Sequence, residues 1–524
     1  DDAVLSGPGG TLLVPLVDYL RWGKAPPHSA LRVVGGERYV ALSAVDGLDS
    51  RFDPDTVTLD LAYAAAALPG SRIDLAPPRR SGVVQPADTS VFVNYALSAS
   101  GDADFDDRRY QAATELGARV GNWLLYGTSD ATWGGNGAKG VTRLLTNLQY
   151  DDRPNLRRLT VGDFFTPTFD LSGSVPMGGL NLAKLYSMDP NFVQYPTAGF
   201  ATEVALPSTL EVRVDGNLVA QRNVAPGPVD VANLTGVTGA RNVTLLVRDP
   251  FGREQVLQQP FYFATNAGLA QGLHEYSYSV GFLRRHYGTE SNDYGDLAAA
   301  AFHRYAFTDR LTLGLRGQAT KDLYNIGPFG TWQHPHLGII GAGISVGGRD
   351  GQSGPGGSLG WSYAGTSLSL ALGARYLSRD YAQLSDFVSP LRPRLDTYAS
   401  ASTYSTALGS LYATYSAITT WEGPESRLWN ISYTRSFLAG KALLAAGYIR
   451  TIEPQKEGRW ALSLRYYFDG VTSAVASVGG VRGEVAAAAT LERTLPQGEG
   501  VGYSLTAGRG VDGVGATYAR GYVQ

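Results

Sequence analysis

The sequence lacks cysteine, is poor in charge and contains no long apolar segment. None of the 524 residues is cysteine, which excludes disulfides and thiolate metal sites. Charged residues make up only 17% of the chain, against about 25% in an average soluble domain. A run of roughly 18 apolar residues, the minimum for a membrane-spanning helix, is also missing. The composition therefore fits neither a typical soluble protein nor a helical membrane protein.

A basic surface and an export signal are absent as well. The formal net charge is −3 and the isoelectric point is near 6.1, which argues against nucleic acid as a partner. The chain opens at Asp1 without the charged and apolar regions of a signal peptide. We therefore expect any export signal to have been removed or to lie outside this chain.

Glycine and tyrosine are the residues in excess. The chain has 65 glycines and 30 tyrosines, and its mean hydropathy is −0.11. A transmembrane β-barrel turns only alternate residues toward lipid, so it needs neither an apolar block nor much charge. Because 524 residues exceed one ordinary soluble core, we expect several domains or one very large barrel.

Residues 1–80 differ in pattern from the rest and predict a small periplasmic domain. The stretch from Leu13 to Trp22 predicts a short amphipathic helix. A Pro-Asp turn then precedes a strand that would place three apolar residues on one face; these are Val57, Leu59 and Leu61. The polar, proline-containing stretch that begins at Pro77 and Pro78 is typical of a linker.

From Thr89, and again beyond Gly272, apolar residues alternate with small or polar ones over runs of about ten positions. Aromatic residues lie near the ends of these runs, as in the girdles around the hydrated lumen of an outer-membrane barrel. The spacing predicts about six strands before Pro196 and about sixteen after Gly272. A large soluble β-solenoid is disfavoured, since no fixed repeat length appears. The clearest apolar faces are Val91, Val93, Tyr95 and Leu97; Tyr276, Tyr278, Val280 and Phe282; Leu311, Leu313 and Leu315; Leu368, Leu370 and Leu372; Trp460, Leu462, Leu464, Tyr466 and Phe468.

Three arginines fall on the polar face of these runs and are predicted to line the lumen. They are Arg316, Arg375 and Arg465. Contact with a plug or with cargo and plain hydration inside the lumen explain them equally well.

The segment between the two alternating blocks has a different pattern. It combines short alternating strands with tight turns over about 60 residues, which predicts a small β-sandwich inserted within the barrel at 205–262. Its strands and turns are marked by Leu210, Val212, Val214, Asp215, Gly216, Pro226, Gly227, Pro228, Val243, Leu245 and Val247. The predicted division is therefore an N-terminal domain at 1–80, barrel strands at 81–204, the sandwich, and further strands at 263–524.

The predicted size of the barrel gives the insertion a role. Above about sixteen strands, side chains no longer fill a barrel, so the lumen becomes an open hole. A folded insertion of this size can close such a hole. Opening must then displace it, which implies a gated pore for a large cargo.

At Leu159-Thr-Val-Gly162-Asp163 the chain begins to resemble the fimbrial outer-membrane usher family of the chaperone–usher pathway. The resemblance continues through a hairpin with Gly178 and Gly179 and through the motifs of the inserted sandwich. Tyr276-Ser-Tyr-Ser-Val-Gly281 is similar to the family's first strand after the plug. Similarity at the N-terminus rests on residues 40–61 and on Val93-Asn-Tyr95.

The resemblance implies a fold and a function. It implies an all-β antiparallel transmembrane barrel of two dozen strands in the outer membrane of a Gram-negative cell, with an immunoglobulin-like plug after the sixth. It also implies a periplasmic N-terminal domain that receives chaperone–subunit complexes. The pore would promote donor-strand exchange between pilus subunits and secrete the growing fimbria. No covalent chemistry, enzyme activity or cofactor is implied, and a homodimer is left open.

The chain departs from this pattern at both ends. By comparison with the family pattern, we expect the N-terminal domain to lack its opening portion. About 22 strands are counted before Gln524, so we also expect the chain to stop before the last two strands and before the two C-terminal periplasmic domains that the resemblance implies. We therefore expect a fragment whose barrel cannot close, because an open sheet edge in lipid is costly.

Several patterns that suggest chemistry have simpler explanations. The nucleophile-elbow pattern Gly343-Ile-Ser345-Val-Gly347 lies within an alternating strand with no helix behind it. A dinucleotide-like pattern at 508–513 is explained by turn glycines, and the glycine-rich stretch 134–140 lacks the spacing of a phosphate loop. A metal site is disfavoured at His334 and His336 because a third ligand is missing. Hairpin solvation explains the acidic run Asp102, Asp104, Asp106 and Asp107 better than calcium binding does.

Other barrels remain as alternatives. A plugged nutrient transporter is the first, but its plug precedes all strands, whereas here about six strands come first. An outer-membrane enzyme would need a nucleophile and base at strand ends, and a simple porin would need no inserted sandwich.

Overall fold

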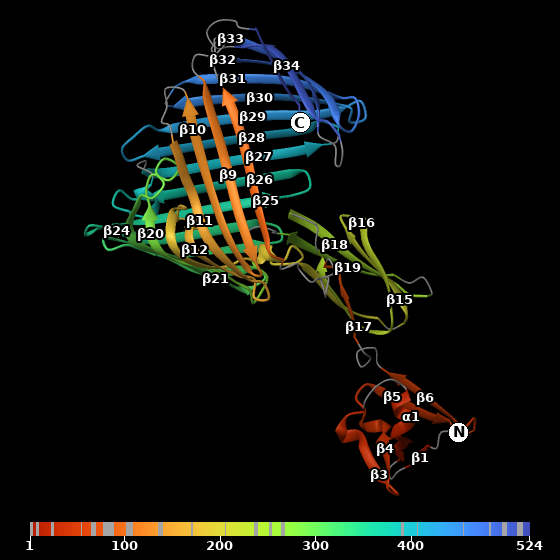
Figure 1. The fold of residues 1–524 in the computed structure, drawn as a ribbon. Coiled ribbons are helices and arrows are strands. Elements are labelled where there is room, and N and C mark those ends of the chain that lie inside the picture. Colours follow the sequence, from red (N-terminus) through yellow and green to blue (C-terminus); the bar gives the residue numbers. More distant parts are fainter. Residues whose placement is uncertain are drawn as a thin grey trace. The chain divides into compact units, whose positions relative to one another are not determined.

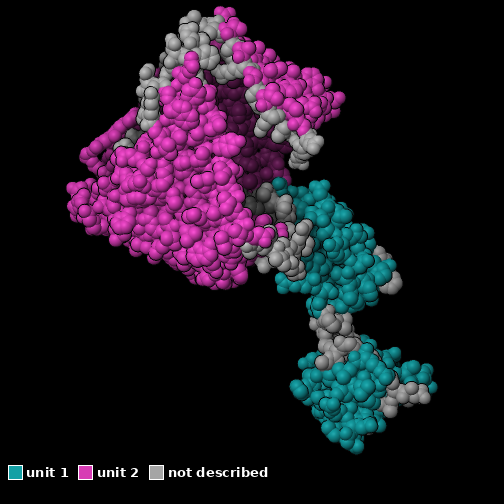
Figure 2. Space-filling model, viewed as in Figure 1, with its two compact units in different colours: residues 1–78, 197–237, 241–261 teal, residues 79–196, 238–240, 262–524 magenta. Residues whose placement is uncertain are grey.

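The computed structural model describes most of the chain in two compact units. One unit holds residues 1–78, 197–237 and 241–261, and the other holds 79–196, 238–240 and 262–524 (Figure 2). The described residues are 4–6, 10–21, 26–53, 55–63, 70–76, 88–100, 108–134, 140–168, 171–204, 206–234, 239–250, 254–263, 268–388, 392–405, 407–453, 455–481, 484–494, 500–510 and 517–523.

The larger unit is a barrel whose wall is one antiparallel sheet (Figure 1). Six described strands precede the inserted module: β8 Ser90–Ser100, β9 Arg109–Val120, β10 Trp123–Gly134, β11 Gly140–Asp152, β12 Arg157–Phe165 and β13 Pro176–Lys184. Sixteen described strands follow it: β20 His274–Arg284, β21 Tyr294–Thr308, β22 Leu311–Ala319, β23 Leu323–His334, β24 Gly338–Arg349, β25 Gln352–Ala364, β26 Leu368–Leu377, β27 Pro393–Ser405, β28 Gly409–Thr420, β29 Ser426–Phe437, β30 Ala442–Glu453, β31 Glu457–Tyr467, β32 Thr472–Val481, β33 Glu484–Arg493, β34 Tyr503–Arg509 and β35 Thr517–Val523. The expected strand numbers on both sides of the insertion are confirmed.

The sheet closes into a barrel in which β35 is the neighbour of β8. The expectation that closure needs two further strands is therefore wrong. The physical reason is that strand number sets the diameter of a barrel, while tilt and stagger adjust to let the sheet close.

The alternation predicted from sequence places apolar side chains on one face of the wall and small or polar side chains on the other. On β20, Tyr278, Val280 and Phe282 are exposed, whereas Ser277 and Ser279, which alternate with them, are buried. An exposed apolar face opposite a polar one is the arrangement of a barrel wall in lipid. Trp460, Leu462 and Leu464 repeat the exposed pattern on β31.

Two short 3-10 helices lie between strands in the described part of the larger unit. They are η5, Tyr186–Met188, after β13, and η6, Leu384–Phe387, after β26. Among the described residues, no helix combines the length and the apolar character needed to cross a membrane.

The N-terminal part of the smaller unit is a small mixed module. Its described elements are β1 Leu5–Ser6, β2 Leu12–Pro15, α1 Leu16–Arg21, η2 His28–Ala30, β3 Leu31–Val34, β4 Glu37–Ala41, η3 Leu42–Ala44, β5 Leu48–Asp53 and β6 Thr58–Tyr63. Its core gathers Val14, Tyr19, Val40 and Leu42. The helix predicted from Leu13 to Trp22 is correct over Leu16–Arg21. Its start is wrong, because Leu13 belongs to β2, where it pairs with Ala41, and Trp22 lies outside the described residues.

The hairpin β5–β6 refines the strand predicted in this module. Leu59 and Leu61 pack against the core, as expected. Val57 instead lies in the turn, with φ of 53° and 76% exposure. The prediction that Val57 shares their strand face is wrong, because the turn extends to that residue.

The rest of the smaller unit is a sandwich of two sheets. Its described strands are β7 Ser71–Asp74, β14 Ala198–Val204, β15 Ser208–Val214, β16 Asn217–Val224, β17 Gly227–Leu234, β18 Gly239–Arg248 and β19 Glu254–Phe263. One sheet has the order β16-β15-β18-β19, and the other has the order β14-β17-β7. The inserted segment therefore begins at β14, before residue 205, because β14 pairs with β17 rather than with a wall strand.

Candidate functional site

The wall of the barrel is continuous across the insertion. Strand β13 pairs directly with β20, with Leu180 opposite Val280 and Asn181 opposite Ser279. The inserted segment thus leaves the wall after β13 and returns at β20 without breaking the sheet. Both connections emerge from the same end of the wall, because β13 and β20 are antiparallel neighbours.

The Gly-Asp motif lies beside this junction. Gly162 pairs with Gly179, and Asp163 pairs with Gly178, between β12 and β13. A β-carbon on Gly178 would lie 2.4 Å from the ring of Tyr294. Glycine is therefore required there, because it makes room for the tyrosine ring to reach the motif strand.

Asp163 is the centre of a buried polar network. Its side chain is 2% exposed and forms an ion pair with Arg143 and a hydrogen bond from the Tyr294 hydroxyl. The backbone N–H of Thr146 donates to the same carboxylate at 2.9 Å. Arg284 adds a second guanidinium 3.6 Å away. Two guanidinium groups, a hydroxyl and a backbone N–H thus compensate the burial of this carboxylate.

Arg284 is fully buried and ties three segments together. Its guanidinium donates to the carbonyls of Leu144 and Arg143 on β11. It also donates to the carbonyl of Ser291, at 2.9 Å, in the β20–β21 connection. The Nε atom of Arg284 has no acceptor among the described residues. This arginine therefore clamps the motif strands to the loop that follows β20.

Sequence reasoning found the motif residues Gly162, Asp163, Gly178 and Gly179 but missed their cationic partners. Arg143 and Arg284 lie far from Asp163 in the chain. A signal did exist, since Arg284 is a charged residue at the end of an otherwise apolar strand face that includes Phe282.

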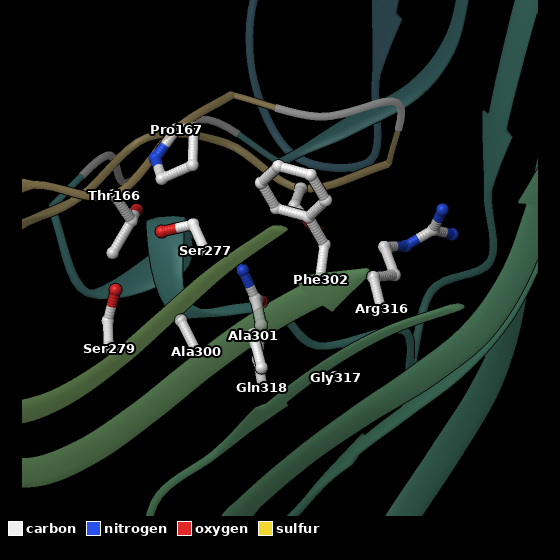
Figure 3. Close-up of a pocket in the computed structure, with 11 residues that line it drawn as sticks. Thr166, Pro167, Ser277, Ser279, Ala300, Ala301, Phe302, Arg316, Gly317 and Gln318 are labelled. Atoms are coloured by element: carbon white, nitrogen blue, oxygen red, sulfur yellow. The ribbon is translucent and has the colours of Figure 1, made fainter. Parts of the chain in front are cut away.

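The polar face of β20–β22 is covered by the connection between β12 and β13. Thr166, Pro167 and Ser172 of this connection line a small cavity together with residues of the three strands (Figure 3). The cavity has a volume of about 20 Å³, enough for about one water molecule. It is too small for an organic ligand. The strand residues are Ser277, Ser279, Ala300, Ala301, Phe302, Arg316, Gly317 and Gln318.

A second segment, residues 378–388, packs on the polar face of the next strands. The Asn325 side chain donates to the carbonyl of Ala382 at 2.8 Å, and the backbone N–H of Leu384 donates to Gln318 at 3.0 Å. Ser345 and Tyr381 share a hydrogen bond of 2.7 Å. Both covering segments contribute to one core cluster of Phe164, Val175, Met177, Leu283, Ala298, Ala300, Leu323, Ala382 and Leu384.

The second segment contains an acid, Asp386, whose pKa is shifted by its surroundings. Burial raises the pKa of Asp386, although the backbone N–H of Gln383 and the nearby Arg392 favour its charged form. Asp386 and Gln383 also form the capping box of η6. The protonation of Asp386 is therefore coupled to the docking of this segment.

The three predicted lumen arginines lie on the polar face of their strands. Arg375 pairs with Asp396 on β27, and Arg465 lies 2.5 Å from Glu492. Arg316 is 2% exposed, with its guanidinium 6.0 Å from the ring centre of Phe329. Their role as lumen lining stays a prediction.

The predicted plug residues divide into core and turns. Asp215 and Gly216, with φ of 48° and 85°, form the tight turn between β15 and β16, and Gly227 begins β17 between Pro226 and Pro228. The buried core of the sandwich includes Leu210, Val212, Val214, Val243, Leu245 and Val247. Their role in gating stays a prediction.

The patterns set aside in the sequence have structural explanations where they are described. Ser345, within β24, shares a hydrogen bond with the Tyr381 hydroxyl, and the rings of His334 and His336 are 5.9 Å apart. One exposed group of possible metal ligands, His286, Glu290 and Asp293, is found among the described residues. The acidic run 102–107, residues 135–139 and the end of the pattern at 508–513 lie outside the described residues.

A wide antiparallel barrel interrupted after its sixth strand by a β-sandwich defines a class, that of large outer-membrane pores with an inserted module. Residues 111–494 match the family model described as outer membrane usher protein. The chain belongs to this family, whose members are non-enzymatic translocation pores of the Gram-negative outer membrane.

Individual relatives share parts of the chain. The outer membrane usher protein LpfC of Salmonella typhimurium is 26% identical over 298 residues, covering 53% of this chain and 34% of LpfC. The outer membrane usher protein AfaC of Escherichia coli is 34% identical over 133 residues, covering 24% of this chain and 15% of AfaC. The chain thus spans about a third or less of the length of these relatives.

Solved structures share the fold. The PapC-PapD-PapK-PapG assembly intermediate of the Escherichia coli P pilus tip matches with a TM-score of 0.62 at 17% identity, covering 92% of this chain and 62% of the other. The translocation pore of the P pilus usher PapC matches with a TM-score of 0.50 at 17% identity, covering 80% and 89%.

Proposed function

We propose that this chain forms the gated pore of an usher that receives periplasmic chaperone–subunit complexes, promotes donor-strand exchange and secretes the growing pilus. The observation that carries the proposal is the pairing of β13 with β20 around an inserted sandwich. A continuous wall with a folded module threaded between two of its strands suits a tube that must be closed at rest and opened for bulky cargo.

The inserted sandwich is the proposed plug. A barrel with more than about sixteen strands has a lumen that side chains do not fill, so the resting pore needs a stopper. Strands β14–β19 form a compact module with its own core. In the resting state this module occupies the lumen, and it leaves the lumen when subunits pass.

The chemistry of transport is strand exchange, without a nucleotide. A subunit that lacks one strand is completed by a strand from its chaperone, and the next subunit replaces that strand by β-augmentation. Folding of the completed subunit then drives export. The PapC assembly intermediate, which contains PapD, PapK and PapG, supports a chaperone and subunits as the partners of such a pore.

Removal of the plug tests this proposal. We expect a variant in which a short Gly-Ser bridge replaces residues 198–262 to show a larger single-channel conductance in planar bilayers and to sensitise cells to large antibiotics. Resistance of the barrel to heat and protease would show that the wall still forms. Unchanged conductance in a folded barrel would contradict the assignment of the sandwich as plug.

A further inference from the structure

One strand of the sandwich comes from outside the inserted segment. Strand β7 lies before the first wall strand, yet it pairs in parallel with β17, with Arg72 opposite Asp230 and Ile73 opposite Val231. Parallel neighbours cannot be joined by a tight hairpin and must come from separated parts of a chain. The sandwich is therefore built from two segments, which the barrel sequence separates.

The contacts of β7 continue past the paired residues. The backbone N–H of Leu75 donates to the carbonyl of Ala232 at 3.0 Å. The side-chain amide of Asn233 donates to both carboxylate oxygens of Asp74 at 3.1 Å. Asn233 adopts φ of 59°, a left-handed conformation that asparagine tolerates better than most residues. Main-chain and side-chain hydrogen bonds thus hold the end of β7 against β17.

Of its described strands, the smaller sheet would keep β14 and β17 without β7. A two-stranded ribbon is marginal in water by itself, and a third strand adds hydrogen bonds and apolar area to it. Val229 and Val231 of β17 are each 1% exposed, and Ile73 shares the face of its partner Val231. Strand β7 therefore extends the apolar face of the sheet and completes the module.

We propose that the outer edge of β17 is a docking site for the linker of the N-terminal module, and that β7 stays docked there while the plug moves. The N-terminal module then stays tethered to the plug through β7 as the plug moves. This inference rests on the proposed function, in which the plug leaves the lumen. The chain from Asp74 to the start of β8 at Ser90 spans up to about 50 Å when extended, which gives β7 the reach to follow the plug.

Cysteine pairs test whether β7 remains docked. The chain has no native cysteine, so two introduced thiols are the only ones present. Arg72→Cys with Asp230→Cys joins β7 to β17, and Ala201→Cys with Asp230→Cys joins β14 to β17 as the matched control. We expect both pairs to form disulfides in the full chain. We also expect oxidation to change the frequency of plug-dependent opening in planar bilayers by less than about twofold for either pair, since neither bond joins parts that separate.

Two results would overturn the inference. One is a disulfide that forms for the control pair but not for the β7 pair. The other is a tenfold or greater loss of opening events on oxidation of the β7 pair alone, reversed by reductant, because β7 would then have to leave β17. Failure of plug deletion to raise conductance would instead contradict the proposed function, whatever the cysteine pairs show.

A proline substitution tests the contribution of β7 to the module. Ile73→Pro removes a backbone N–H within the strand, so we expect several-fold more spontaneous opening of the resting pore. Ile73→Val keeps the strand and should leave opening unchanged. Equal behaviour of the two variants would contradict a structural role of β7 in the plug.

Discussion

Asp163 shares a strand face with Val161 and Phe165, which are both exposed. An ionised carboxylate on this apolar outer face needs complete compensation, because lipid offers no hydrogen bonds. Arg143, Arg284 and the Tyr294 hydroxyl supply it. Gly178 lets the tyrosine ring approach. The aspartate of the Gly-Asp motif is therefore explained by its cationic partners, and Gly178 is explained by the room that the Tyr294 ring needs.

Loss of the Asp163 carboxylate is expected to weaken the wall. Asp163→Ala leaves the buried Arg284 without its counter-charge, a change that costs about 3–5 kcal/mol for a buried pair. The measurement is the midpoint of urea unfolding for the barrel refolded in lipid vesicles. Asp396→Ala is the control, since its partner Arg375 is partly exposed and such pairs contribute about 0–1 kcal/mol. Equal losses in the two variants would contradict the role of burial.

At the scale of elements, we expect the docking of segment 378–388 to depend on pH. The pKa of Asp386 is raised in the folded state by burial, so the docked segment binds a proton more tightly than the undocked one. Docking is then strongest below the ordinary carboxyl pKa, weakens as the pH rises toward the raised pKa, and is constant above it.

Limited proteolysis measures this dependence. We expect cleavage within 378–388 to be slower near pH 4 than at pH 7, with the rates corrected for the activity of the protease on an unfolded substrate. Asp386→Asn keeps a hydrogen-bond acceptor for Gln383 and should remove the pH dependence. A dependence that persists in this variant would assign the effect to another group.

Elements with a local signature were predictable from the sequence. Alternation around Tyr278 and Leu464 predicted wall strands, because the side-chain period of a strand is visible within a few residues. The turn at Asp215-Gly216 was predictable because an Asp-Gly pair tolerates the positive φ angles of a tight hairpin turn. The extent of β2 was not predictable, because Leu13 is held in a strand by pairing with Ala41. A local sequence pattern contains no information on that pairing.

At the scale of the whole molecule, the outward face of the wall is a lipid surface. Leu464 is exposed on this face, and Ser463 beside it on β31 lies on the polar face. We expect Leu464→Arg to cost up to about 2–4 kcal/mol, depending on its depth in the bilayer, and Ser463→Arg to cost much less. Equilibrium folding into vesicles provides the comparison. A greater loss for Ser463→Arg would reverse the assignment of the two faces.

By itself, the sequence determined the all-β wall, the number of strands on either side of the insertion and the family to which the chain belongs. These features depend on alternation, turns and motifs that lie within short stretches. Only the tertiary structure decided the closure of the barrel, the partners of Asp163 and the place of β7 beside β17. Those contacts join residues far apart in the chain, and their free energies depend on burial and register, which appear only when the strands are assembled.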